Sequence, residues 1–188
     1  MKKTISTSLL FWILFIASFS ASAKLFDFED LPDSASVTDQ YVADGVSFAN
    51  TIALTSGFSL NEIDYPPYSG KVVVGDDGNG PVEITFSNLT NNVSAYFTYS
   101  TKLTINVYGE NSSFLGSINS ATSSNLGSNT LISIAYQGIK RLQISGESPE
   151  SFVMDNLQPV PEPDEYALFG VGFLAIYIRL GYHRRKLG

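Results

Sequence analysis

The sequence predicts an all-β protein, an antiparallel β-sandwich of jelly-roll type, flanked by an N-terminal signal peptide and a C-terminal transmembrane helix. Three observations lead to this prediction. Between residues 24 and 158, short runs alternate apolar and polar residues, and no stretch keeps the roughly 3.6-residue apolar period of an amphipathic helix. Clusters of Gly, Asn, Asp, Ser and Pro separate these runs. Uninterrupted apolar segments lie near the two ends of the chain.

The first segment, residues 1–23, has the layout of a cleavable signal peptide. Lys2 and Lys3 form a positive start, Leu9–Phe19 is an apolar run, and Ala21-Ser22-Ala23 supplies the small residues that signal peptidase requires. The alternative is an uncleaved anchor, but the run is short for a span of about 20 residues. We therefore expect a mature chain that begins at Lys24.

The middle segment, residues 24–158, has the size of one ordinary domain. Its turn chemistry is concentrated at Asp76–Pro81, Gly109–Ser112 and Gly146–Pro149. The candidate strands, in chain order, are Leu25–Glu29, Val46–Asn50, Lys71–Val74, Val82–Phe86, Val93–Tyr99, Leu103–Tyr108, Ser113–Ile118, Leu131–Tyr136, Arg141–Ser145 and Ser151–Leu157.

Charge and composition exclude several kinds of function for this domain. From Lys24 to Val160 there are five basic and fifteen acidic residues, a net charge of minus ten, which would repel nucleic acid. The chain has no cysteine, and its single histidine is His183 near the C-terminus. A Ser-His-Asp arrangement and a histidine or cysteine zinc site are therefore absent from the domain. We expect no enzymatic activity and no required cofactor.

The C-terminal tail, residues 159–188, changes composition sharply. Pro159–Pro163 reads as a stiff, extended spacer, because proline lacks the backbone N–H that helices and sheets use. Tyr166–Ile178 follows without a charge, and a basic cluster, Arg184, Arg185 and Lys186, lies close to the chain end. A buried C-terminal helix is the alternative. The all-round apolarity and the basic end instead favour a helix in the inner membrane, with the acidic domain outside.

Pro161-Glu162-Pro163, an apolar segment and a basic cluster in this order resemble the PEP-CTERM sorting signal of bacteria that make extracellular polysaccharide. The resemblance covers about residues 160 to 188. It implies an inner-membrane-anchored precursor that an exosortase, a membrane transpeptidase, recognises near Glu162. The implied partners are signal peptidase, this exosortase and an exopolysaccharide, and the implied destination is the cell envelope or the extracellular matrix.

The middle segment also resembles the jelly-roll domains of many exported bacterial proteins, which are similar to carbohydrate-binding modules. The resemblance lies in Phe26–Leu31, in the central INVYGENSSFLGS run and in Phe152–Leu157. It implies a structural Ca²⁺ near the terminal strands, with Glu29, Asp155 and Asp27 as candidate ligands. Alternation does place Asp27 and Glu29 on the face opposite the phenylalanines. The alternative is that these carboxylates only solvate an outer face.

Two loops are candidates for ligand contact. Tyr65-Pro66-Pro67-Tyr68 holds two tyrosines on a stiff segment, where they could stack on a sugar ring. The run Asp76–Gly80 could bind a metal ion, but it lacks the glutamate spacing of an EF-hand, and a turn explains it better.

The sequence therefore predicts an exported, C-terminally sorted, non-enzymatic envelope or matrix protein associated with exopolysaccharide. One alternative is a lectin-like carbohydrate-binding module tethered at the cell surface. A weaker alternative is a glycoside-active enzyme that uses a pair of its many carboxylates.

Overall fold

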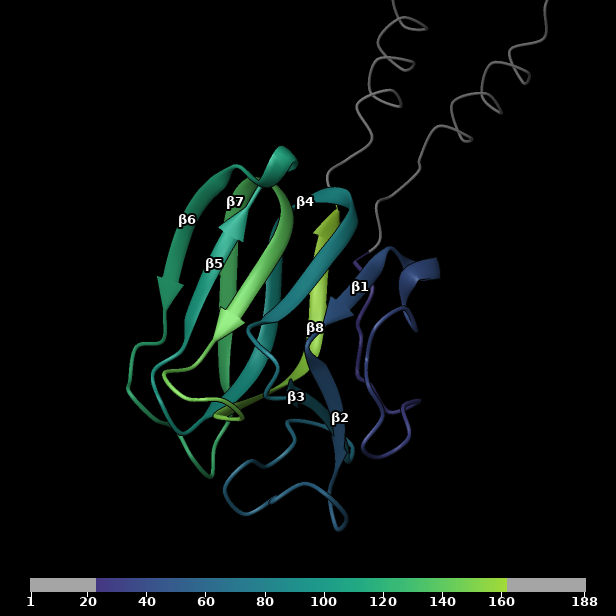
Figure 1. Ribbon diagram of the computed structural model, residues 1–188, viewed down its shortest axis with the longest axis vertical. Helices are drawn as coiled ribbons and strands as arrows, with labels where there is room; N and C mark the ends of the chain where they lie inside the picture. The colour runs from purple at the N-terminus through teal and green to yellow at the C-terminus, as the bar shows by residue number, and fades with distance from the viewer. Residues whose placement is uncertain (1–22, 162–188) are drawn as a thin grey trace, which may run out of the picture. The chain divides into compact units, whose positions relative to one another are not determined.

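The protein is described here by a computed structural model, in which residues 23–161 are placed (Figure 1). These residues form an all-β structure in which every named strand pair is antiparallel. The helical parts are two short 3-10 turns, η1 (Val42–Asp44) and η2 (Glu110–Ser112). The strands are β1 (Val46–Ala49), β2 (Thr51–Thr55), β3 (Val72–Asp76), β4 (Val82–Tyr99), β5 (Thr104–Tyr108), β6 (Phe114–Asn119), β7 (Thr130–Ser145) and β8 (Phe152–Pro161).

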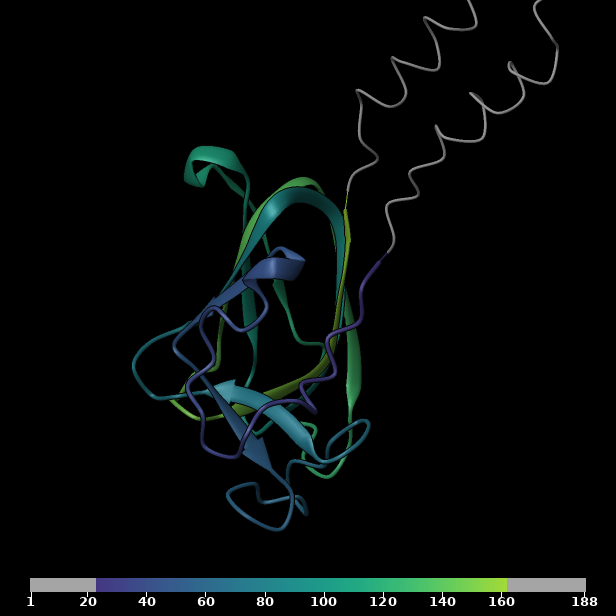
Figure 2. The ribbon, with the colours of Figure 1, turned by 90° about the vertical axis from the view of Figure 1, so that its right-hand side faces the viewer.

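Two long strands, β4 and β7, belong to both layers of the structure. The sequence predicts two separate strands at each of these places, whereas each pair is fused into one strand of 18 or 16 residues. The polar residues that suggest turns instead bend the ladder. Its register shifts between Thr85, Thr90 and Asn92 of β4, and Gly138 of β7 has a φ of +72°. In Figure 2 both strands arch from one layer to the other at these bends.

The bends divide the strands into two layers. In the first layer, the first half of β4 pairs with β1 and with the second half of β7, which in turn pairs with β5, and β5 with β6. In the second layer, the order is β2, β3, β8, the second half of β4 and the first half of β7. The antiparallel sandwich predicted from the sequence is thus confirmed at the level of fold class.

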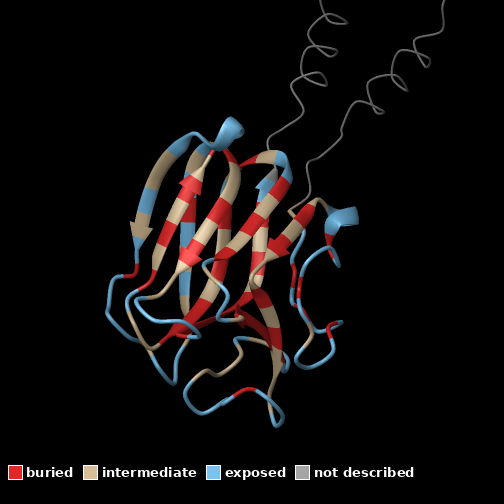
Figure 3. Cartoon of the chain, viewed as in Figure 1, coloured by how far each residue is buried: buried red, intermediate tan, exposed pale blue. Residues whose placement is uncertain are grey.

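The core lies between the layers and follows from the period-two pattern. Buried and less buried positions alternate along the strands, as Figure 3 shows by colour. Phe26 and Phe28, predicted to share a face, are both buried, with 2% and 0% of their surface exposed. They pack edge-to-face against Tyr41, and Phe28 also against Phe48, at centroid distances of 5.3–5.9 Å.

The ends of the domain differ from the predicted boundaries. The expected strand Leu25–Glu29 is reduced to one bridge, Phe26 to Leu157, because Phe28 turns the chain with a φ of +62°. At the other end β8 continues to Pro161, past the boundary expected at residue 158. Pro159 and Pro161 are tolerated because the end of β8 pairs with β4 on one side only, while β3 pairs with the start of β8. On the side without a partner strand, a missing N–H costs no ladder hydrogen bond.

Strand β2, Thr51–Thr55, was not predicted from the sequence. It pairs along its full length with β3, and its other edge is covered by residues 34–37, since Val37 N–H donates to the Thr51 carbonyl at 2.8 Å. Among residues 23–161, no helix is long and apolar enough to span a membrane.

Candidate functional site

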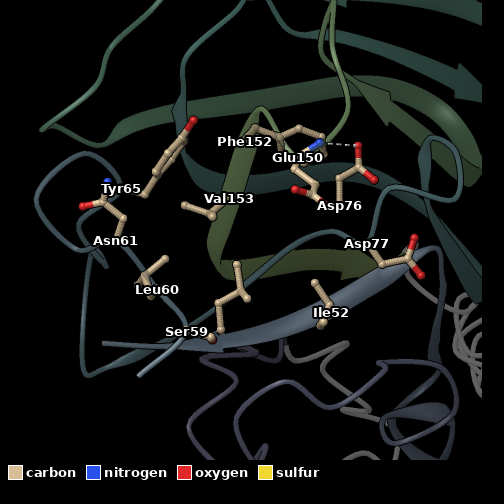
Figure 4. A pocket seen from close by; sticks show the side chains of 11 residues that line it. Ile52, Ser59, Leu60, Asn61, Tyr65, Asp76, Asp77, Glu150, Phe152 and Val153 are labelled. Carbon is tan, nitrogen blue, oxygen red and sulfur yellow. Dashed lines mark hydrogen bonds between the residues drawn. The ribbon is translucent and has the colours of Figure 1, made fainter. Parts of the chain in front are cut away.

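A cavity of about 300 Å³ lies on the outer side of β2, β3 and β8 (Figure 4). Residues from four separate parts of the chain line it: β2, the loop from residue 56 to 71, the end of β3, and the segment around the start of β8. The lining residues are Ile52, Leu54, Ser59, Leu60, Asn61, Tyr65, Asp76, Asp77, Glu150, Phe152 and Val153.

The floor of this pocket is apolar and follows from strand geometry. Successive side chains of a strand point to opposite faces, so the neighbours of core residues point outward. In β3, Val72 and Val74 join the main core, while Val73 between them belongs to a smaller cluster on the outer face. Val153 of β8 and Leu60 of the loop complete that cluster. Together they provide a water-excluding surface beneath the cavity.

The loop of residues 56–71 forms one wall of the pocket. It is held to the loop of residues 120–129 by two hydrogen bonds: Gly127 N–H donates to the Asp64 carbonyl at 2.7 Å, and Asn129 Nδ2 to the Pro66 carbonyl at 3.0 Å. Within the loop, Tyr65 N–H donates to the Asn61 carbonyl at 2.8 Å. These bonds fix Tyr65 so that its ring packs against the outer cluster and borders the cavity.

The opposite end of the pocket carries three carboxylates. Asp76 is nearly buried, with 8% exposed, and its two oxygens accept N–H groups from Gly78 at 2.7 Å and Glu150 at 3.2 Å. Asp77 accepts the N–H of Asn79 at 2.9 Å. Glu150 has a left-handed backbone with a φ of +54°, an unfavourable conformation that the bond to Asp76 helps to hold. The run after β3 is therefore a turn, and its carboxylates border the cavity.

The two tyrosines predicted to bind a ligand together have separate surroundings. Tyr65 borders the pocket, whereas Tyr68 stacks flat on Tyr96 of β4, with ring centroids 3.4 Å apart and an interplanar angle of 8°. Tyr68 is 49% exposed, so its free face remains accessible. The proline-containing segment thus directs one tyrosine into the pocket and the other onto the sheet.

Glu29 and Asp155, the first two candidate Ca²⁺ ligands, both bind the segment of residues 69–72. Glu29 Oε1 accepts N–H groups from Lys71 and Val72, both at 2.8 Å. Asp155 accepts the N–H of Ser69 at 2.9 Å through Oδ2 and its own neighbour's N–H at 2.7 Å through Oδ1. The two carboxylates therefore hold the end of the same loop that forms the pocket wall.

Burial raises the pKa of Asp155 to about 6. The backbone N–H donors lower this pKa, but burial outweighs them, and the nearby charge of Glu29 raises it further. Asp155 is 1% exposed. The ion pairs found among residues 23–161 join Lys24 to Asp44 and Arg141 to Glu83, so neither involves this carboxylate pair.

The oxygen atoms around Glu29 and Asp155 are of the kinds that bind Ca²⁺. Carboxylate, amide and hydroxyl oxygens come from Glu29, Asp155, Asn156 and Ser69, and the last two are joined by a 3.0 Å hydrogen bond. The carboxylate of Asp27 instead accepts the Glu29 N–H at 3.4 Å. Within the described residues, no three acidic or histidine side chains are grouped closely enough to hold a metal ion. Calcium therefore stays a prediction, in which carbonyls and water would complete the coordination.

Other predicted residues fall at or beyond the end of the described chain. Pro161 is the last residue of β8 and pairs with Thr90. Glu162 and Pro163 of the sorting motif lie outside residues 23–161, as do the signal peptide, the apolar tail segment and the basic cluster Arg184, Arg185 and Lys186.

Glu150 and the apolar floor are parts of the site that no sequence pattern singled out. Glu150 follows a turn of Gly, Ser and Pro, where an acidic residue is ordinary. Val73 and Val153 look like any strand residues, and the unpredicted β2 supplies Ile52 and Leu54. A run of three valines, Val72–Val74, was the available signal, because it indicates a strand that is buried on both faces.

No family model matches this sequence, and no curated protein matches it either. Among solved structures, it is similar to the K1 cleaved adhesin domain of Lys-gingipain from Porphyromonas gingivalis, with 9% identity and a TM-score of 0.47 over 76% of this chain and 99% of that one. A family 6 carbohydrate-binding module from Clostridium stercorarium, solved with cellobiose, has 15% identity and a TM-score of 0.41 over 74% and 94%. A Stig cyclase from Fischerella has 11% identity and a TM-score of 0.47 over 76% and 100%. Structural similarity with identities and TM-scores this low says nothing about the ligand or activity of this chain.

Proposed function

We propose that this chain is an exported, non-enzymatic glycan-binding protein, which binds a short saccharide in the pocket outside β2, β3 and β8. The observation that carries the proposal is the pocket itself: an apolar floor with a tyrosine at one end and hydrogen-bonding groups at the other. Its volume of about 300 Å³ lies at the lower end of the roughly 300–1,000 Å³ typical of small-molecule sites.

This combination suits the two-sided chemistry of a sugar ring. The C–H groups of a pyranose form apolar patches that can lie on Tyr65 and on the valine and leucine floor. Its hydroxyls can donate to the carboxylates of Asp76 and Asp77, and the amide of Asn61 offers a further polar group. Because the loops that carry these residues are fixed by hydrogen bonds, the pocket is formed before the ligand arrives, which lowers the entropic cost of binding.

The arrangement of the carboxylates favours binding of a glycan over its hydrolysis. A glycosidase needs one carboxylic acid to protonate the leaving group and a second carboxylate to attack or to activate water. Both oxygens of Asp76 accept backbone N–H groups, from Gly78 and Glu150, so this carboxylate is engaged in holding the turn.

We further propose that the domain is sorted to the cell envelope or the extracellular matrix, where it associates with exopolysaccharide. The signal peptide pattern and the PEP-CTERM-like tail support this part of the proposal. The pairing orders β3-β8-β4-β7 and β4-β7-β5-β6 in the two layers support the jelly-roll topology.

The test is glycan binding by the wild-type chain and by Tyr65→Ala. We expect saturable binding of at least one saccharide, weakened about 5- to 150-fold in the variant, since stacking on an aromatic side chain is worth roughly 1–3 kcal/mol by analogy with the stacking of nucleic-acid bases. Tyr108→Ala is the matched control, because Tyr108 lies in the other layer, with its ring 4.4 Å from the Arg141 guanidinium. If both variants lose affinity equally, or if Tyr65→Ala binds as the wild type does, the pocket is not the binding site.

Tyr68→Ala distinguishes the two tyrosines of the Tyr65-Pro66-Pro67-Tyr68 segment. If the pocket is the site, this variant keeps most of the affinity. If the free face of Tyr68 is the sugar platform, Tyr68→Ala loses binding and Tyr65→Ala does not.

A further inference from the structure

The charged groups of the pocket lie at one end of it. This uneven distribution indicates which class of sugar the pocket would bind. Figure 4 shows Asp76, Asp77 and Glu150 at one end and Tyr65 with Asn61 at the other. None of the residues that line the cavity is basic. A ligand that spans the pocket therefore meets an aromatic ring at one end and up to three negative charges at the other.

Backbone hydrogen bonds between distant segments form the acidic end of the pocket. Asp76 is held by two backbone N–H donors, and one of them comes from Glu150, which is distant in the sequence. The carboxylate of Glu150 lies close to Gly78, where a Cβ would come within 3.3 Å of Oε1. Among the described residues it accepts no hydrogen bond and forms no ion pair. The unfavourable left-handed backbone of Glu150 thus places a free carboxylate beside the Asp76–Asp77 turn.

We propose that the pocket selects an amino sugar, a hexosamine unit that carries a free ammonium group, and rejects uronic acids. This inference rests on the proposed glycan-binding function and specifies its ligand class. The ring face lies toward Tyr65, and the ammonium group points to the acidic end, where it gains charge-assisted hydrogen bonds. An N-acetylated sugar lacks the charge. A uronate would add another negative charge beside three carboxylates, in a domain that already carries a net charge of minus ten.

The experiment compares three oligosaccharides of equal length by titration calorimetry on the full-length chain in detergent. They are a β-1,4-linked glucosamine oligomer, its fully N-acetylated counterpart and an oligouronate. We expect the free amine to bind about tenfold more tightly than the N-acetylated oligomer at low salt, since each partly exposed ion pair contributes a factor of up to about five. The difference should shrink as salt is added, and the oligouronate should not bind.

A charge-neutral variant and a matched control locate the preference. Asp77→Asn with Glu150→Gln removes two charges at nearly constant shape, and we expect the preference for the free amine to fall to within about twofold. Asp39→Asn with Glu110→Gln removes the same two kinds of charge outside the pocket and should keep the tenfold preference.

The outcomes distinguish this inference from the proposed function. If the N-acetylated oligomer binds as tightly as the free amine, the site is a glycan pocket and the amino-sugar inference is wrong. If both double variants lose the preference equally, the effect comes from overall charge and not from the pocket, which also overturns the inference. If none of the three saccharides binds, the inference fails, and the proposed function then depends on the wider glycan screen with Tyr65→Ala.

Discussion

Replacing Asp155 with asparagine tests the buried charge that holds the pocket wall. In the folded protein the pKa of Asp155 is raised to about 6, against 3.8 for an exposed aspartate, chiefly by burial. A folded-state pKa above the unfolded one means that the folded protein binds the proton more tightly. The contribution of Asp155 to stability is therefore fully present below about pH 4 and is lost as the pH rises through about 6.

The size of the effect follows from the shift. Since one pH unit corresponds to about 1.4 kcal/mol, the change from 3.8 to about 6 sets an upper limit of about 3 kcal/mol. Asparagine adds a term that does not depend on pH. Both oxygens of Asp155 accept backbone N–H groups, from Ser69 and Asn156, and an asparagine retains only one acceptor. The lost bond costs about 1–3 kcal/mol.

The assay is urea unfolding of the wild type and Asp155→Asn at pH 4, 5, 6 and 7, in the presence of a chelator. The stability difference between the two proteins should be largest at pH 4 and should decrease by up to about 3 kcal/mol towards pH 7. Asp39→Asn, at an exposed position, should show no such trend. A difference that stays constant from pH 4 to pH 7 would refute the assignment, because Asp155 would then not titrate in this range.

Three further predictions concern the same region and the tail. Calcium should raise the melting temperature of the wild type at pH 7 but not that of Glu29→Gln/Asp155→Asn; no stabilisation of the wild type would exclude this site. Gly70→Ala should lower the free energy of unfolding by about 1–3 kcal/mol, because φ is +58° and a Cβ would push the Glu29 carboxylate away from the Lys71 and Val72 N–H groups; Gly57→Ala, with open space around it, should cost less. The mature protein from its host should end near the Pro-Glu-Pro motif, and Glu162→Ala should abolish that end, as intact mass would show.

The fold class was accessible from the sequence because strand periodicity is local. Phe26 and Phe28 lie in the core as the alternation predicts, and most of the predicted strands occur within a few residues of their expected bounds. The misses have physical causes. The bends in β4 and β7 use Asn, Ser and Gly, the residues that also make turns, so each long strand looked like two.

The candidate site was only partly accessible. Tyr65 was identified because its loop is stiff and aromatic, and Glu29 and Asp155 because the resemblance to carbohydrate-binding jelly rolls implies a Ca²⁺ near the terminal strands. Glu150 gave no signal, since its importance depends on a hydrogen bond from its N–H to Asp76, which lies 74 residues away in the chain. No periodic pattern encodes a contact of that kind.

By itself, therefore, the sequence determined what depends on near neighbours: the acidic balance and the alternation that buries one face of each strand. The local patterns at its two ends predict export and sorting. The tertiary structure decided which outward faces meet. It placed Ile52 of an unpredicted strand, Tyr65 of a loop and the carboxylates after β3 around one pocket. The reason is that side-chain direction is set residue by residue along the backbone, whereas a pocket is set by how bends and long-range pairing bring distant segments together.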